Sequence, residues 1–452
     1  MRLLKQLDQK DSLQVGKQLH DFAAELYPIC RSITGDGTRQ TLAKIQQRIA
    51  LRLSDVPTGT QVFDWVIPKE WNINDAYIKD ETGKRVVDFC RSNLHVVSYS
   101  VPVHAVMPLS DLRPHLFSLS EHPDWIPYRT SYYKEDWGFC LSHKDLLALN
   151  DGEYDVCIDA TLEDGSLSYG ECYLPGKLTD EVLISSHICH PSLANDNLSG
   201  LTVATALAQL LSREERRYSY RFVFAPGTIG AIAWLARNRD NVARIKHGLV
   251  LTGIGDVGEF HYKKSRRGNA EIDQAMAHVL RHCGEPSEIL EFSPYGYDER
   301  QYCSPGFNLA VGCLMRSVWG TFPEYHTSAD NLDFIQPLKL ADSLRVCAGV
   351  VDILENNRRY QNLSPHCEPQ LGKRNLYQTS GNMNGLDVNV RLWVLNFSDG
   401  EHSLLDIADR SGIPFPTIND AAQLLSKSDL LTAVADEIEL PKGAWLRRST
   451  AT

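Results

Sequence analysis

The 452-residue sequence lacks the features that would place it in a membrane or an oxidising compartment. No apolar run approaches the roughly 20 residues that a membrane-spanning helix requires. The first residues, MRLLKQLDQKDSL, contain no apolar stretch of signal-peptide length. The 11 cysteines form no CxxC pair and no even framework of the kind that disulfide-rich secreted domains show. These absences predict a cytoplasmic protein with reduced thiols and no membrane insertion.

The sequence also lacks an excess of basic residues. It has 46 Lys and Arg against 57 Asp and Glu, which gives a formal net charge of −11. Because binding to phosphates requires concentrated positive charge, this composition argues against a general nucleic-acid binder. The hydrophobic share of 43% is ordinary for a folded protein. The length predicts two or three domains, each with its own core.

The most informative stretch that is present is SSHICHPSLANDNLSG, residues 185–200. A short β-branched apolar run precedes it, and Ala and Leu at helical spacing follow it over 201–211, so we expect a loop between a buried strand and a helix. Such loops, at the carboxyl ends of strands, carry the chemistry of open α/β sheets. We therefore expect His187, His190 and Asp196 to lie at the mouth of a cleft.

Alternation of strand and helix patterns indicates an α/β fold with a mostly parallel sheet and helices on both faces. Residues 1–62, helical over most of 13–53, and residues 152–358 are assigned to this domain. Residues 63–151 are rich in aromatics, proline and β-formers, which predicts an inserted β-rich domain. The expected elements of the main part are strands at 154–158, 168–174, 181–185, 220–225, 248–254 and 308–314, and helices at 229–237, 270–283 and 337–356.

Residues 359–452 are predicted to form a winged-helix-like domain. Three helical patterns, at 386–395, 403–408 and 417–425, with a turn at Gly412, match the helix-turn-helix outline. The segment in the position of a recognition helix, FPTINDAAQLL, contains no basic residue that could bind phosphate. We therefore interpret the tail as a packing or oligomerisation module, with a second copy of the chain as its candidate partner, and expect no nucleic-acid binding.

Residues of the right type for a zinc site occur in two polar loops. Zinc takes nitrogen and oxygen ligands, and a catalytic site usually has three from the protein. His187 and Asp196 can meet one ion from a single loop. His326, in the later stretch PEYHTSAD, is the candidate third ligand.

The motifs HICHP, NDNLSG and EYHTSADN, with Gly255 and Asp256 after an intervening strand, resemble those of the zinc-dependent aminopeptidase superfamily, which includes bacterial leucyl aminopeptidases and glutaminyl cyclases. The whole chain is similar to a bacterial branch of aminopeptidase-like proteins with an inserted β domain and a winged-helix tail, through YPICRSITGDG, DWVIPKEWNI, YGYDERQYCSPG and EPQLGKR. The resemblance implies an aminopeptidase-like fold and metal ligands at His187, Asp196 and His326.

The sequence departs from active members of that superfamily at an acidic pair that supplies the general base and a metal ligand. Gly227 and Thr228 occupy these positions, and neither can accept a proton at neutral pH. Thr252 stands where the superfamily has an aspartate ligand. We therefore expect one zinc per chain, held by the three ligands above, with His190 or Asp256 as a further ligand.

The stretch YGYDERQY offers a replacement for the missing base. The resemblance places this loop at the cleft, where Asp298 or Glu299 could act as base or ligand, and Arg300 could bind a substrate carboxylate through two hydrogen bonds. Tyr297 of the same loop and Arg31 of an earlier loop are further candidates for substrate binding. The alternatives are a solvated, self-paired turn for the charged triplet and a helix-to-helix turn for the loop of Arg31.

These observations predict a zinc-dependent hydrolase of peptide or small-molecule amide bonds, of aminopeptidase type, with metal-activated water as the nucleophile. Two alternatives stay open. Gly227 and Thr228 favour a catalytically remodelled binding or regulatory protein, and the tail favours, less strongly, a metabolite-responsive DNA-binding regulator.

Overall fold

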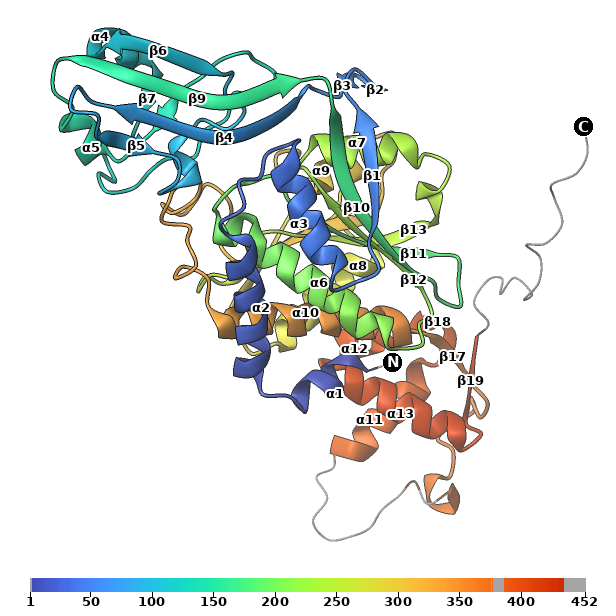
Figure 1. The fold of residues 1–452 in the computed structure, drawn as a ribbon. Helices are drawn as coiled ribbons and strands as arrows, with labels where there is room; N and C mark the ends of the chain where they lie inside the picture. The colour runs from blue at the N-terminus through green and yellow to red at the C-terminus, as the bar shows by residue number, and fades with distance from the viewer. Residues whose placement is uncertain (1, 375, 377–385, 435–452) are drawn as a thin grey trace, which may run out of the picture.

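An eight-stranded sheet forms the centre of the computed structural model, which describes residues 2–374, 376 and 386–434 (Figure 1). In spatial order its strands are β1 (Arg52–Pro57), β10 (Ser166–Leu174), β12 (Ser219–Ala225), β11 (Glu181–His187), β13 (Ile245–Leu251), β16 (Val311–Met315), β14 (Phe260–Lys263) and β15 (Ser287–Leu290). The run from β12 to β16 is parallel, as is the pair β14 and β15. The other neighbours are antiparallel. The mostly parallel α/β sheet is confirmed.

Helices cover both faces of this sheet. One face carries α1 (Leu3–Asp8), α2 (Ser12–Leu26), α3 (Asp36–Gln46), α6 (Gly200–Ser212), α8 (Glu271–His282) and α10 (Pro337–Asn356), and the other carries α7 (Ile229–Arg237) and α9 (Glu299–Tyr302). Side chains of β12 alternate between the two cores: Phe222 and Phe224 enter the first, Val223 and Ala225 the second. Because both faces of a central parallel strand are buried, its sequence is a continuous apolar run. Among the described residues, no helix has both the length and the apolar character that spanning a bilayer requires.

Glycine at position 200 brings α6 against the ends of the central strands. A Cβ on Gly200 would lie 2.4 Å from the carbonyl oxygen of Leu251 at the end of β13. Only glycine tolerates such an approach of two backbones. The loop between β11 and α6 is therefore held directly over the carboxyl ends of the parallel strands.

The insert has its own antiparallel sheet, in the order β5-β4-β9-β6. Its strands are β4 (Glu70–Lys79), β5 (Arg85–Asp88), β6 (Val103–Pro108) and β9 (Glu153–Glu163), and the smaller elements are β2 (Gln61–Val62), β3 (Trp65–Val66), α4 (Leu109–Leu112), β7 (Leu116–Phe117), β8 (Phe139–Cys140) and α5 (His143–Leu147). Residues 154–158, assigned from the sequence to the main domain, lie in β9 and pair with β4 and β6. The insert's sheet therefore extends past the expected boundary at 151, because β9 is one continuous strand.

The tail has the expected order of helices. It consists of β17 (Arg359–Asn362), α11 (Leu386–Phe397), β18 (Asp399–Ser403), α12 (Leu404–Ser411), α13 (Phe415–Lys427) and β19 (Leu431–Ala433). The three strands form one sheet in the order β18-β17-β19. Ser403 caps α12, and Gly412 ends it with a φ of 69°. Residues 435–452 of the expected tail domain lie outside the described residues.

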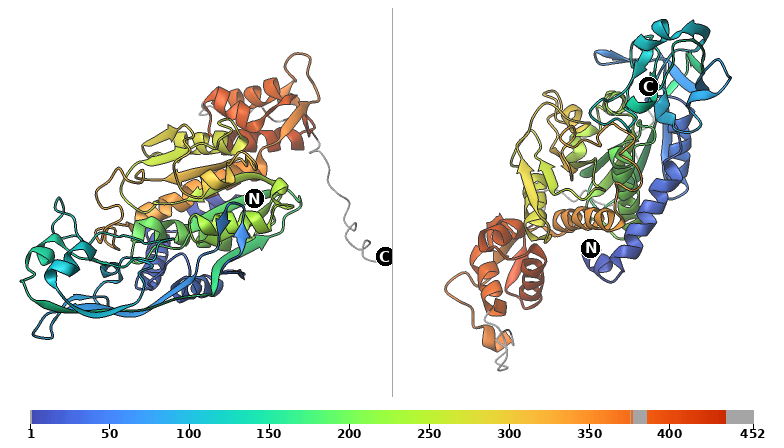
Figure 2. Two further views of the ribbon diagram at one scale, coloured as in Figure 1. Left: turned by 90° about the horizontal axis from the view of Figure 1, so that it is seen from above. Right: turned by 90° about the vertical axis from the view of Figure 1, so that its left-hand side faces the viewer.

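The tail and the insert lie at opposite ends of the main domain (Figure 2). Helix α13 of the tail faces the main domain: the backbone N–H of Phe415 donates to Nε2 of His278 at 3.0 Å, and Arg2 pairs with Asp420. His278 Nδ1 lies 2.7 Å from the carboxylate of Asp409 in α12. The helix in the recognition position thus makes contacts within this chain.

We expect Phe415→Ala to destabilise the docked tail. Its ring is 2% exposed at the start of α13, and truncating a buried phenylalanine costs about 3–5 kcal/mol. Leu424→Ala, on the same helix but 39% exposed, should change the unfolding free energy by at most about 0.5 kcal/mol. Urea unfolding measures the free energy of unfolding of the two variants. Equal losses of this free energy would contradict the packing of α13 against the main domain.

Candidate metal centre

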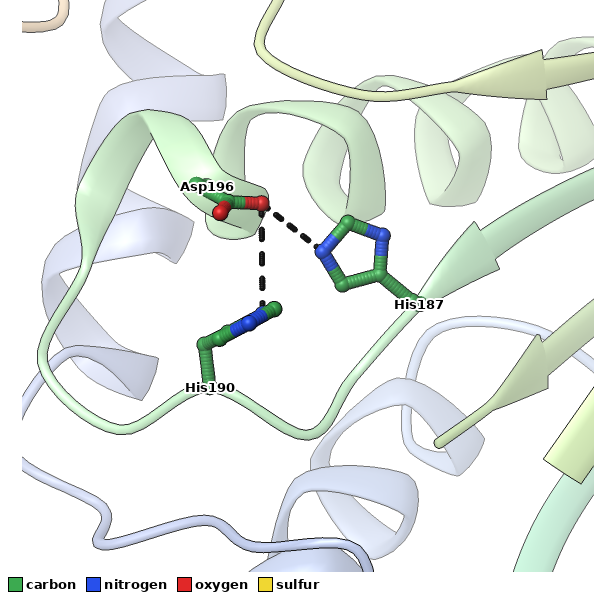
Figure 3. A group of neighbouring side chains, drawn as sticks. All are labelled: His187, His190 and Asp196. Atoms are coloured by element: carbon green, nitrogen blue, oxygen red, sulfur yellow. Dashed lines mark hydrogen bonds and ion pairs between the residues drawn. The ribbon is translucent and has the colours of Figure 1, made fainter. Parts of the chain in front are cut away.

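Three predicted ligands meet at the carboxyl end of β11 (Figure 3). His187 is the last residue of β11, His190 follows in the loop, and Asp196 lies in the helical turn η3 (Ala194–Ser199). Nε2 of His187 lies 2.8 Å from Oδ1 of Asp196, and Nδ1 of His190 lies 3.9 Å from the same oxygen. One ligand atom from each of the three lies within 4.8 Å of the others, so the group could hold a single metal ion.

Two further predicted residues reach the same aspartate from other loops. Nε2 of His326 lies 3.1 Å from Oδ2 of Asp196, and the hydroxyl of Tyr297 donates to Oδ2 at 2.7 Å. The ring of Tyr297 also stacks on His187 with 4.4 Å between centroids. The structure thus brings His187, His190, Asp196, His326 and Tyr297 together.

The donors at this point suit zinc, which takes imidazole nitrogen and carboxylate oxygen. Burial by itself raises the pKa of Asp196, but its electrostatic interaction with His190 and its hydrogen bonds with His187 and His326 hold that pKa well below its usual value. Burial lowers the pKa of His190 to about 3. An ionised carboxylate beside a neutral imidazole is the protonation state that metal ligands adopt.

Asp298 lies next to the position where the superfamily has its acidic pair. A Cβ on Gly227 would be 3.5 Å from Oδ1 of Asp298 and 3.1 Å from Cβ of His187. The carboxylate of Asp298 is fully buried, and neither of its oxygens has a hydrogen-bond partner among the described residues. Burial raises its pKa to about 7. The absence of a side chain at Gly227 is therefore matched by a carboxylate that enters from another loop.

Glu299, the other candidate for the base, has a different environment. Its carboxylate is fully buried and lies 2.5 Å from Nζ of Lys263. Lys263 also donates to the carbonyl oxygens of Ser293 and Tyr295, at 3.2 and 2.8 Å. The ammonium of Lys263 lies against Oε1 and compensates the charge of Glu299, whereas no cation is paired with Asp298 among the described residues, so we retain Asp298 as the candidate base.

Asp256 and Arg31 are engaged in holding loops. The carboxylate of Asp256 accepts hydrogen bonds from Nδ2 of Asn195 at 2.7 Å and the hydroxyl of Ser317 at 2.7 Å, and it is not in the group of neighbouring ligand atoms. Arg31 is 1% exposed and donates to the carbonyl oxygens of Leu26, His190 and Pro191. Burial lowers the pKa of Arg31 to about 10. Arg31 thus fixes the turn that bears His190.

Arg300 is half-buried at the start of α9, and its Nε has no hydrogen-bond partner among the described residues. Its charge contributes to lowering the pKa of the neighbouring Asp298, against the larger effect of burial. Arg300 is thus a cation beside the candidate base.

Three residues at the site were not identified from the sequence. The ring of Tyr128, from the insert, meets His190 and His326 edge-on, with centroid distances of 5.3 and 5.1 Å. Tyr325 stacks on His326 at 3.9 Å, and the buried Asp330 accepts from the backbone of the turn that bears Asp196. Tyr325 and Asp330 flank His326 in EYHTSADN, which is a local signal. Tyr128 has none.

We expect the Lys263 and Glu299 pair to be structural. Lys263→Met leaves a buried carboxylate unpaired, which costs about 3–5 kcal/mol, and adding Glu299→Leu should recover most of that loss. Lys144→Met, which breaks the exposed pair with Asp124, should cost at most about 1 kcal/mol. Chemical denaturation of the variants gives the coupling energy, and a double variant no more stable than Lys263→Met would contradict the assignment.

Comparison with known proteins identifies the family. The profile described as "Domain of unknown function (DUF4910)" matches residues 20–357, and a winged helix-turn-helix profile matches residues 358–433. A Clostridium acetobutylicum protein, provisionally named a polysaccharide biosynthesis protein with aminopeptidase-like domain, is 50% identical over 94% of this chain and 98% of its own.

Solved structures agree with the expected fold. The crystal structure of a protein provisionally named a peptidase, from C. acetobutylicum, has a TM-score of 0.91 at 50% identity, over 95% of this chain and 99% of its own. A zinc aminopeptidase from Bacillus subtilis has a TM-score of 0.54 at 13% identity, over 74% of this chain and 94% of its own, which shows a shared fold. The resemblance to zinc aminopeptidases is thus confirmed for the fold. Because the profile match spans most of the chain, this protein belongs to the DUF4910 family.

Proposed function

We propose that this protein is a metal-dependent hydrolase of amide bonds in peptides or small molecules, with zinc as its metal. The observation that carries the proposal is the convergence of three histidines and one aspartate at the carboxyl ends of the parallel strands. A buried, unpartnered carboxylate, Asp298, lies beside them. The aminopeptidase-like fold supports a hydrolase, and the zinc aminopeptidase of that fold supports the choice of metal.

His187, Asp196 and His326 would hold the zinc ion, with His190 as a further ligand. When bound there, the metal would polarise the scissile carbonyl and lower the pKa of a water molecule. Tyr297 fixes the orientation of Asp196 through its 2.7 Å hydrogen bond. The ring of Tyr128 meets His326 edge-on, and the ring of Tyr325 stacks on it, so the two tyrosines restrict the orientation of this imidazole.

Asp298 would accept the proton that the nucleophilic water loses. Its oxygens have no competing hydrogen bond, and it lies against Gly227 and the backbone side of His187. A general base must reach its proton directly or through one water. Among the described carboxylates beside the ligands, Asp298 is the one that belongs neither to the ligand group nor to an ion pair or hydrogen bond.

The substrate we propose is a peptide or a small molecule with an amide bond. Arg300 is the cation available in the loop of the base for a substrate carboxylate. The name of the C. acetobutylicum relative mentions polysaccharide biosynthesis, so N-acylated sugars belong in the substrate panel beside aminoacyl amides.

Gly227 and Thr228 favour a second function, a binding protein that has kept the cleft and lost hydrolysis. This alternative predicts zinc binding without turnover of any amide in the panel. It is distinguished from the hydrolase by the two variants described next.

Purified protein is expected to contain about one zinc per chain, since ligand atoms of His187, His190 and Asp196 lie within 4.8 Å of one another. His187→Ala should lose most of this zinc, because the imidazole that ends β11 is removed. His104→Ala, an exposed histidine of the insert, should retain it. Elemental analysis after dialysis measures the zinc content of the three proteins. Equal zinc in His187→Ala and native protein would contradict the assigned centre.

Asp298→Asn is expected to keep its zinc and to lower kcat on an active amide substrate by about 10²–10⁴-fold, the usual contribution of a general base. Glu291→Gln, which removes a carboxylate that is 77% exposed, should leave kcat unchanged. The measurement is initial rates with parallel zinc analysis. A fully active Asp298→Asn would eliminate this residue as the base, and an inactive native protein would favour the binding function.

A further inference from the structure

Asp330 joins the two loops that carry the candidate zinc ligands. It follows His326 by four residues, and its side chain is fully buried. Its two carboxylate oxygens accept the backbone N–H groups of Asn195, at 2.6 Å, and Asp196, at 2.9 Å. Its own carbonyl oxygen accepts the N–H of Ala194 at 3.0 Å. Three consecutive N–H groups of the turn that bears Asp196 are therefore held by one residue of the His326 loop.

The same residue closes the turn around His326. The N–H of Asp330 donates to the carbonyl oxygen of Thr327 at 3.1 Å, which makes the segment after His326 compact. The turn after His326 couples the position of Asp330 to that of His326. The hydrogen bonds that Asp330 accepts from the backbone couple it to Asp196. The separation between the two candidate ligands therefore depends on Asp330.

Each loop is also anchored away from the other. Asn195 donates to Asp256 at 2.7 Å and accepts from the N–H of Gly255 at 2.8 Å, which ties the Asp196 turn to the loop after β13. The N–H of Tyr128 donates to the carbonyl oxygen of His326 at 2.8 Å, which ties the His326 loop to the insert. Asp330 bridges these two separately anchored loops.

We propose that Asp330 is a positioning residue of the zinc centre, which sets the relative placement of Asp196 and His326. The inference rests on the zinc binding in the proposed function. Buried N–H groups require partners, so replacing Asp330 leaves up to two of them unsatisfied and lets the turn shift. Groups that orient metal ligands without touching the metal typically change its affinity by about 10–100-fold when they are removed.

The first test is Asp330→Asn, which keeps the size of the side chain and places an amide NH₂ against one of the two N–H donors. Zinc affinity, measured by competition with a chromophoric chelator, should fall by about 10–100-fold. Asp333→Asn, the same change at an exposed position of the same loop, should leave the affinity unchanged. Native affinity in Asp330→Asn would overturn the proposal.

A second variant and a second readout address a loss of folding. Asp330→Glu keeps the carboxyl group and lengthens the side chain by one methylene, so it should bind zinc more weakly than native protein while remaining folded by circular dichroism. In cobalt-substituted protein both variants should alter the visible absorption bands, which report ligand geometry and not stability. Bands identical to those of native protein would assign Asp330 a purely structural role and overturn the proposal.

These measurements need no substrate, so the two proposals fail separately. Native protein that binds zinc but hydrolyses nothing would contradict the hydrolase and leave the role of Asp330 to be decided by affinity. Native protein that binds no zinc would overturn both proposals.

Discussion

The buried carboxylate of Asp196 is the group on which the arrangement of this site depends. It is 2% exposed and interacts with His187, His326 and Tyr297, each from a different segment of the chain. A carboxylate removed from water is costly unless it is paired and hydrogen-bonded. The folded state therefore requires that the end of β11, the His326 loop and the loop of Tyr297 meet at this point. The polar contacts farther out hold these three segments in place.

Two carboxylates in the same site have opposite environments. Asp196 has a partner on each oxygen, whereas Asp298 has no hydrogen-bond partner on either, although both are buried. A paired carboxylate suits metal ligation, and an unpaired one is free to take a proton. Different roles for two neighbouring carboxylates usually arise from such a difference in surroundings. Glu299, adjacent in sequence to Asp298, has a third environment because Lys263 neutralises it.

Much of the fold could be predicted because its signals are local. The helices at 229–237 and 337–356 have the expected bounds, since apolar spacing and Pro337 mark them within one window of sequence. The four-residue strands β14 and β15 were missed, because strands so short have too few residues to show a pattern, and β14 pairs with β16 far along the chain.

Prediction of the site was limited in the same way, because only residues that are close in the sequence or share a motif could be grouped. His187, His190 and Asp196 were grouped because they share one loop, and His326 was added because it lies in a second polar loop and because it also fits the family motif. The ion pair of Glu299 could not be foreseen, because Lys263 lies on a strand well upstream and nothing local marks it as a partner. The contacts of Tyr128 with two histidines were equally hidden, since they arise from the way the insert folds back on the main domain.

The parallel sheet and the insert contribute different parts of the site. The parallel strands supply His187 and a fold that is shared with a zinc aminopeptidase of 13% identity. The insert supplies Tyr128, whose backbone holds the His326 loop and whose ring covers two of the candidate ligands. The insert and the loop of Asp298 therefore add side chains around the candidate ligands, whereas the parallel sheet fixes the strand end from which His187 projects.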